Sequence, residues 1–168
     1  MAATTPIMSL PYPVDTDNPG TLAVHTAIQN LATTFDAFFG AWTTWTPQID
    51  QGGTTNIAKT NNNSRWRSVG KFFEFEMRVT MTAGGTASNK ITFTLPVTCK
   101  NTGLLLIGWG SVNDVSATSD YQRGVYLDTS SATKGIWLAS GGAIGANTMT
   151  AALASGDILT AVGFGEAQ

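Results

Sequence analysis

The sequence predicts a mainly β fold: an antiparallel, jelly-roll-like β-sandwich that follows an extended N-terminal arm and one short α-helix. Two observations predict it. Charged residues make up only 12% of the 168 residues and 18 are glycine, which suits many strands and turns better than a helical enzyme. Apolar residues also occupy every second position over about ten residues, which is the period of a strand. These residues are Phe73, Phe75, Met77, Val79 and Met81.

The alternating segment, residues 71–82, is expected to form a hairpin with residues 90–96, which follow a glycine-rich turn. Alternation resumes in the second segment and stops at Pro96, which cannot donate a backbone hydrogen bond. One face of such a hairpin is apolar, so a second sheet must cover it. Phe75 and Phe93 are therefore predicted to face the core from paired strands.

The remaining strands are expected at short, regular intervals along residues 41–168, the predicted sandwich domain. They are residues 43–49, 55–60, 64–68, 103–112, 121–128, 134–139 and 157–165. Eight or nine strands at such spacing are typical of a sandwich. Residues 103–110 are apolar enough to be covered on both faces, and Val125–Leu127 are expected to pair with Ile136–Leu138 in a hairpin.

Residues 1–19 form the predicted arm. Four prolines exclude a helix there, and the apolar residues between them favour docking on a partner over a solvated tail. A disordered terminus is the alternative. The expected anchoring residues are Ile7, Leu10, Tyr12 and Val14.

Residues 20–40 form the predicted helix, with Asn18 as its N-cap, Pro19 in its first turn and Gly40 at its end. Its apolar residues are spaced four, three, four and three apart, which is a heptad seam. They are Val24, Ile28, Leu31, Phe35 and Phe38. This spacing favours a parallel helical bundle between subunits, a short trimeric stalk. A single amphipathic helix lying on its own domain is the alternative.

Composition argues against several classes of function. The net charge of −2 and the lack of a basic block argue against nucleic-acid binding. No apolar run approaches the roughly 20 residues that span a membrane, and the first nine residues do not resemble a signal peptide. Cys99 is the single cysteine, which excludes an intrachain disulfide and is consistent with folding in a reducing cytoplasm.

No catalytic, cofactor or metal site is predicted. His25 and Cys99 are the only residues of their kinds, too few for a nucleophile–base arrangement or a zinc site. Glu74 and Glu76 share a strand face, about 7 Å apart, which could suit a glycosidase. A solvated or intersubunit face with Arg78 as partner is the favoured interpretation. The glycine-rich segments around residues 108–110 and 141–145 are interpreted as turns.

Four aromatic residues could stack on sugars if they were exposed. They are Trp109, Tyr121, Tyr126 and Trp137. Burial in the sandwich is the favoured alternative, because Trp109 and Trp137 lie within apolar runs.

Four short motifs carry a family resemblance: Trp42–Pro47, Arg65–Lys71, Thr92–Val97 and Gly156–Leu159. In this order they resemble the C-terminal β-sandwich module of small tail-associated and fibre-like virion proteins of tailed bacteriophages, especially phages of actinobacteria. The helix, which follows Tyr12–Asp17, is similar to the one preceding that module. The resemblance covers roughly residues 12–166. It departs from the family pattern at Trp66, where tyrosine is commoner, and at Phe164-Gly165, where an aromatic residue directly before Glu166 is usual.

The resemblance implies a non-enzymatic homotrimeric virion component with no catalytic residues to carry over. It would be made in the bacterial host cytoplasm and lie on the outer surface of the virion, on capsid or tail, with its arm against another virion protein. The second hypothesis is a carbohydrate-binding module that recognises a host-surface glycan. The two functions can coexist, because a displayed sandwich can carry a binding loop.

Overall fold

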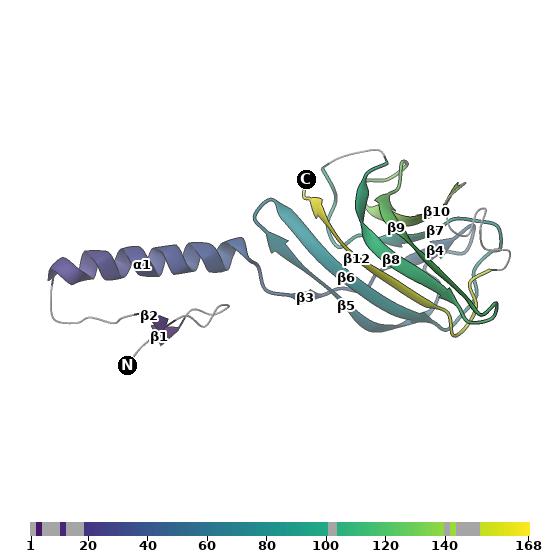
Figure 1. The fold of residues 1–168 in the computed structure, drawn as a ribbon, viewed down its shortest axis with the longest axis horizontal. Helices are drawn as coiled ribbons and strands as arrows, with labels where there is room; N and C mark the ends of the chain where they lie inside the picture. Colours follow the sequence, from purple (N-terminus) through teal and green to yellow (C-terminus); the bar gives the residue numbers. More distant parts are fainter. Residues whose placement is uncertain (1–2, 5–10, 13–18, 101–103, 140–141, 144–151) are drawn as a thin grey trace.

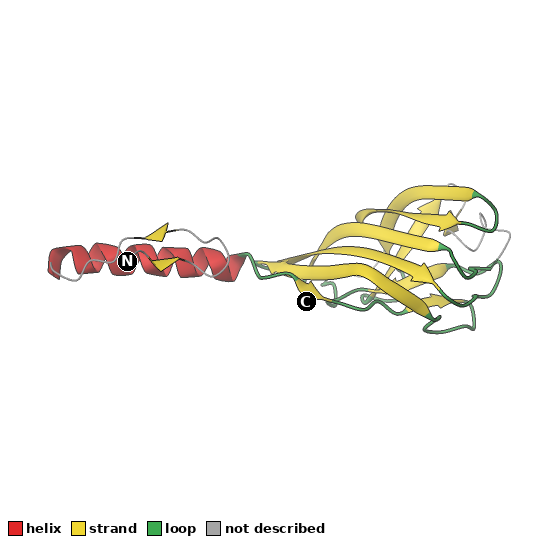
Figure 2. Ribbon diagram, turned by 90° about the horizontal axis from the view of Figure 1, so that it is seen from below, coloured by secondary structure: helices red, strands yellow, loops and turns green. Residues whose placement is uncertain are grey.

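The computed structural model describes residues 3–4, 11–12, 19–100, 104–139, 142–143 and 152–168. In these residues one helix projects from a curled antiparallel sheet (Figure 1). The helix and the sheet follow one another along the long axis of the molecule (Figure 2). The predicted mainly β, sandwich-like fold with a helix before it is therefore confirmed.

The helix α1 spans Pro19–Phe38, so it begins at the predicted proline; Asn18 lies outside the described residues. Its last helical hydrogen bond runs from the Phe39 amide to the Phe35 carbonyl at 3.0 Å. The chain then leaves the helix to pair with the sheet, since Gly40 donates to the Ser68 carbonyl at 2.8 Å. Gly40 does not have the positive φ of a helix-ending glycine. A glycine is required at this position because a Cβ would collide with the Ser68 hydroxyl.

Twelve strands occur in the described residues. Two lie in the arm and pair with each other, and the others form the sheet domain. They are β1 Ala3–Thr4, β2 Pro11–Tyr12, β3 Thr43–Thr44, β4 Ile49–Gln51, β5 Lys59–Val69, β6 Phe72–Met81, β7 Ile91–Thr94, β8 Leu106–Asp114, β9 Ser119–Leu127, β10 Lys134–Ala139, β11 Gly142–Ala143 and β12 Ile158–Glu166.

The sheet has the order β3-β5-β6-β12-β8-β9-β10-β7-β4, with β11 beside β10. Its two end strands, β3 and β4, are separated in sequence by only Trp45–Gln48. Within this connection the Trp45 amide donates to the Ser64 carbonyl of β5, and the Thr94 amide of β7 donates to Gln48, both at 3.0 Å. The connection thus joins the two ends of the sheet, which folds over itself into two facing layers.

The predicted hairpin of residues 71–82 and 90–96 is wrong. Strand β6 pairs with β5 and β12, whereas β7 pairs with β10 and β4. The nine residues between β6 and β7 can span about 30 Å when extended. They therefore cross the roughly 10 Å between the layers easily. The alternation itself is confirmed, because the five apolar side chains at the odd positions of β6 are all buried, whereas Phe72 at its start faces outward.

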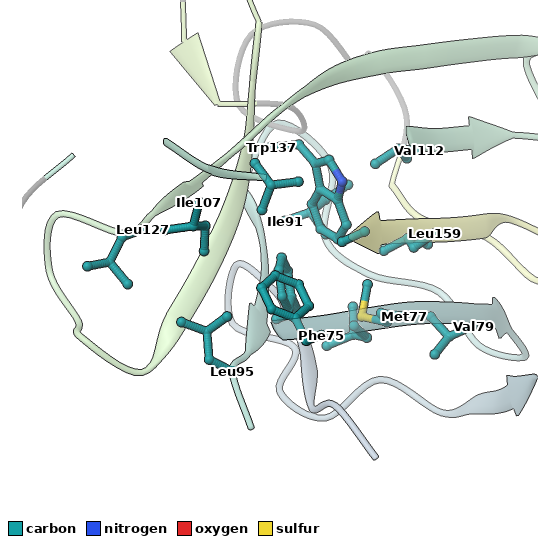
Figure 3. Packing of buried hydrophobic residues seen from close by; sticks show 14 of the residues in the cluster. Phe75, Met77, Val79, Ile91, Leu95, Ile107, Val112, Leu127, Trp137 and Leu159 are labelled. Atoms are coloured by element: carbon teal, nitrogen blue, oxygen red, sulfur yellow. The ribbon is translucent and has the colours of Figure 1, made fainter. Parts of the chain in front are cut away.

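Phe75 and Phe93 do meet in the core, but they meet across it and not along a strand pair. Their ring centroids are 6.0 Å apart, and Phe93 lies 5.0 Å from the ring of Trp137 in β10. The Trp137 indole donates to the Thr160 carbonyl of β12 at 3.0 Å, which satisfies its buried N–H. Figure 3 shows Trp137 facing Phe75 and Met77 between the layers.

Other predicted strands need smaller corrections. Residues 59–69 are a single strand, β5, in place of the two expected at 55–60 and 64–68, with a bulge near Asn61. Residues 43–49 contain only β3 and the start of β4. The hairpin that joins Val125–Leu127 to Ile136–Leu138 is confirmed as β9 and β10.

The glycines around Trp109 lie inside β8 and not in the predicted turn. Gly108 pairs with Gly163 of β12, and a Cβ on either glycine would collide with the backbone of the opposite strand. The glycines thus allow β8 and β12 to approach closely. The second glycine-rich run, residues 141–145, lies mostly outside the described residues.

Candidate functional site

The helix exposes its apolar side. Four of the five predicted seam residues, Ile28, Leu31, Phe35 and Phe38, are between 39% and 59% exposed; the side chain of Val24 lies outside the described residues. The residues that are at least half-buried form another face: Gln29, Ala32, Asp36 and Phe39.

The burial of Asp36 distinguishes α1 from an ordinary surface helix, which buries apolar residues. It is only 7% exposed, and among the described residues neither of its carboxylate oxygens has a hydrogen-bond partner. A helix lying on its own domain buries its apolar stripe and exposes its polar face. Helix α1 buries an aspartate and leaves two phenylalanines half-exposed, so its apolar stripe is available to another molecule.

The exposed stripe continues to the edge of the sheet domain. The Phe38 carbonyl accepts a hydrogen bond of 2.8 Å from Gly70, in the turn between β5 and β6. The Phe38 ring lies where a Cβ on Gly70 would be, and the φ of +60° at Gly70 also favours glycine. The turn is thus shaped to receive the last seam residue.

The outer face of β5 and β6 carries a ladder of paired charges. Arg65 pairs with Glu76, and Arg67 with Glu74, each directly across the strands. Both guanidinium groups stack on the ring of Trp42, at 4.7 and 4.9 Å from its centroid. The prediction of Arg78 as the partner of these glutamates is therefore wrong. Since an arginine binds each carboxylate, neither is free in the way a glycosidase acid must be.

Beside this ladder lies an exposed apolar patch, the outer-face patch, which the sequence did not predict. It consists of Phe72, Trp109, Val162 and Phe164, which are between 51% and 64% exposed. Val162 stands directly between Trp109 and Glu76 across the three strands. A hollow of about 400 Å³ lies among Trp42, the two glutamates, Trp109, Val162 and Phe164.

The patch overturns two expectations about burial. Trp109 was expected inside, yet it is 64% exposed, whereas Trp137 is buried as expected. Tyr121 and Tyr126 are half-buried. Residues 103–110 were expected to be covered on both faces, but β8 begins at Leu106, and Leu104, Leu105 and Leu106 are all exposed. The signal that was missed lies in β12, where Gly163 and Gly165 alternate with the outward residues because the rings of Phe75 and Phe73 fill the inner side.

A second hollow, of about 460 Å³, is lined by charged and polar groups of the β4–β7–β10 layer. In it Lys134 pairs with Asp50 and Lys90 with Asp128, both at 2.7 Å. Burial alone would raise the pKa of Asp128, but the hydrogen bonds from Lys90 and Ser130 outweigh it and hold the pKa below its usual value. Burial opposes the bonds from Lys134, Asn56 and Gln48 in the same way at Asp50, whose pKa is also lowered. These two ion pairs connect loop residues to the strands of the sheet.

These two aspartates should make the sheet domain sensitive to acid. A depressed pKa in the folded state means that the stabilisation is present above the unfolded pKa, about 3.9. It is lost as the pH falls through and below that value. Asp128→Asn should lower the free energy of unfolding by about 1–3 kcal/mol at pH 7 and flatten its decline between pH 5 and 3. Denaturant unfolding at several pH values checks this; a variant whose decline is as steep as that of the wild type would contradict it.

Chemistry-bearing residues are sparse in the part of the chain that is described. No three His, Cys, Asp or Glu residues there cluster as a metal site would require. Cys99 is buried, and burial raises the pKa of its thiol. His25 lies in α1, but its side chain is outside the description. Among the described residues, no helix is both long enough and apolar enough to cross a membrane.

The arm is described only in part. Ile7, Leu10 and Val14 lie outside the described residues, and Tyr12 lies in β2. Strands β1 and β2 pair antiparallel, with Ala3 opposite Tyr12, so these two pieces of the arm run in opposite directions and not as one extended segment. They lie beside α1 in both views (Figures 1 and 2).

No known protein family, no curated protein and no solved structure matches the chain.

Proposed function

We propose that the protein is a non-enzymatic structural component of a bacteriophage virion. It is a homotrimer in this proposal, either tail-associated and fibre-like or a capsid decoration or head-fibre protein. The arm attaches it to another virion protein, the helices form a stalk, and the sandwich is displayed outward. The exposed apolar stripe of α1 carries the self-association in this proposal, and the resemblance of four sequence motifs supports the virion assignment.

The stripe supports self-association for a physical reason. Four large apolar side chains on one side of a projecting helix are costly to keep in water. A helix of 20 residues whose apolar side is left uncovered is also only marginally stable. Three such stripes around a common axis cover one another in the manner of a coiled coil, and each helix stabilises the other two.

The elongated shape and the arm fit attachment at one end. Strands β1 and β2 of the arm lie beside α1 and not beside the sheet domain (Figure 1). Three arms on one trimer raise the avidity for a particle, because the second and third bind at a high effective concentration. Prolines in the arm reduce the entropy lost on docking. A weak individual contact can therefore hold a whole trimer.

The positions of the four resembling motifs support the virion assignment. Trp42–Pro47 contains β3 and most of the connection between the two ends of the sheet, and Arg65–Lys71 contains the arginines of the charge ladder and the turn that receives Phe38. Thr92–Val97 contains most of β7, and Gly156–Leu159 begins β12 with a φ of +100° at Gly156. Each motif thus occupies a structurally important position, and motifs shared by the members of a structural module are expected at such positions.

Removing residues 2–14 tests the proposal. The truncated protein should stay a folded trimer in light scattering, because the helix and sheet domain are intact, but it should no longer join virus particles. The full-length protein, produced in the same cells, is the control for incorporation. Cross-linking on particles should place the arm against another virion protein. Normal incorporation of the truncated protein would show that the sheet domain is the docking surface, and a monomeric full-length protein would contradict the trimer.

One observation favours the second candidate, a module that binds a host-surface glycan. Trp109 is exposed beside a hollow, and exposed tryptophan rings commonly stack on sugars. Glycan-array binding by the full-length protein, lost in Trp109→Ala, would support this function. Unchanged binding in that variant would place any glycan site elsewhere.

A further inference from the structure

We infer that the outer-face patch of Phe72, Trp109, Val162 and Phe164 is a contact surface for a second copy of this chain. Subunits would then be joined through their sheet domains as well as through their helices. The inference rests on the proposed self-association and extends it to a surface that the helix seam does not include.

The patch is too apolar to be ordinary surface. Each of its four side chains is more than half exposed, and they occupy adjacent strands, since β12 lies between β6 and β8. Single exposed apolar residues are common, but a contiguous group of large ones marks an interaction site. Aromatic residues in particular are enriched at the centres of protein interfaces.

The patch is continuous with the helix seam. Phe38, the last seam residue, lies against Gly70, and Phe72 is two residues further on, at the start of β6. Phe72 and Phe164 lie on the same outer face, because Phe72 is opposite Glu166 and Glu74 is opposite Phe164. One apolar strip therefore runs from the helix across the turn and onto the sheet.

The area of this strip indicates what covers it. Such side chains expose roughly 100–250 Å² each when free, so the half-exposed helix residues offer on the order of 350 Å² and the patch about 450 Å². A stable interface buries about 800 Å² per partner. The seam offers less than half of such an area, and the patch more than doubles the apolar surface that assembly can cover. A second copy that follows the helix seam can therefore also cover the patch.

The neighbouring charges allow a close approach. Glu74 and Glu76 border the hollow beside the patch, and arginines already neutralise both. A neighbouring subunit can therefore cover them without burying an unpaired charge, which would be costly. The same pairing disfavours a sugar, because sugars need free polar groups close to the aromatic ring. The hollow of about 400 Å³ has room for an apolar side chain of the neighbour.

Three full-length variants test the inference. Phe164→Lys and Trp109→Lys each place a charge in the patch, and Val115→Lys is the matched control. Val115 is also an exposed apolar residue, at 51%, but it lies in the turn after β8. All three side chains point into solvent, so circular dichroism and the unfolding transition of a diluted sample should remain close to those of the wild type. Sedimentation over a range of concentrations then measures assembly.

The patch variants should need at least about tenfold more protein than the wild type to assemble, and Val115→Lys should assemble as the wild type does. If both patch variants assemble normally while the wild type is a trimer, the inference is wrong and the proposed helix-mediated assembly stands. A wild type that stays monomeric overturns both. Variants that assemble normally but lose glycan or cell binding would show that the patch binds sugar and not a second copy.

Discussion

Phe93→Ala should lower the free energy of unfolding of the sheet domain by about 3–5 kcal/mol. Phe93 is fully buried, and its ring contacts three other aromatic rings, those of Phe75, Trp137 and Trp45, with centroids between 5.0 and 6.4 Å away. These residues come from both layers and from the connection between the sheet ends. Removing the ring therefore leaves a cavity where all three parts meet, and urea unfolding followed by tryptophan fluorescence measures the loss.

Phe93→Leu is the matched control, because it keeps most of the volume. It should cost less than about 1.5 kcal/mol. A similar small loss in Phe93→Ala would mean that the layers do not depend on this ring for their packing. Phe75→Ala provides an independent check, since Phe75 occupies the opposite layer and is also buried.

Ile28→Asp should abolish trimer formation at micromolar concentration. Ile28 lies in the exposed stripe of α1, and in the proposed bundle three carboxylates would converge in an apolar seam. Desolvating an unpaired charge costs several kcal/mol, which exceeds the contribution of any single seam residue. Multi-angle light scattering should report a monomer, while the near-ultraviolet circular dichroism of the sheet domain should be preserved.

Asn30→Asp is the control for this experiment. It adds the same charge to the same helix at an exposed position outside the stripe, and it should leave the trimer intact. If Ile28→Asp remains a trimer, the helix seam does not join the subunits. If its sheet domain unfolds as well, the helix and sheet domain share a core and do not form separate units.

The sequence determined the features that depend on local patterns. The two-residue period of β6 is visible in the sequence, and the structure buries the five apolar residues at its odd positions as that period requires. The heptad spacing in α1 and the start at Pro19 are equally local. The hairpin of β9 and β10 was predictable because its two apolar runs are separated by a short turn.

Strand pairing could not be predicted from neighbourhood in sequence. Segments β6 and β7 look like a hairpin, because glycines lie between two alternating runs. The connection is nevertheless long enough to change layers, and β12, almost 80 residues further along the chain than β6, takes the place beside it. Pairing between strands so far apart in sequence depends on how the whole sheet curls. A short stretch of sequence does not carry that information.

Only the tertiary structure decided which face of β8 and β12 is inside. Trp109, Val162 and Phe164 are large apolar residues of these strands, so burial scales place them in the core. The core is already filled there by rings of β6, since Phe75 and Phe73 contact Gly163 and Gly165 from within. At these positions the glycines must therefore face inward, and Val162 and Phe164 between and beside them face outward. The pattern of apolar residues predicted that these segments are strands. The volume left in the core determined which of their side chains are exposed to solvent.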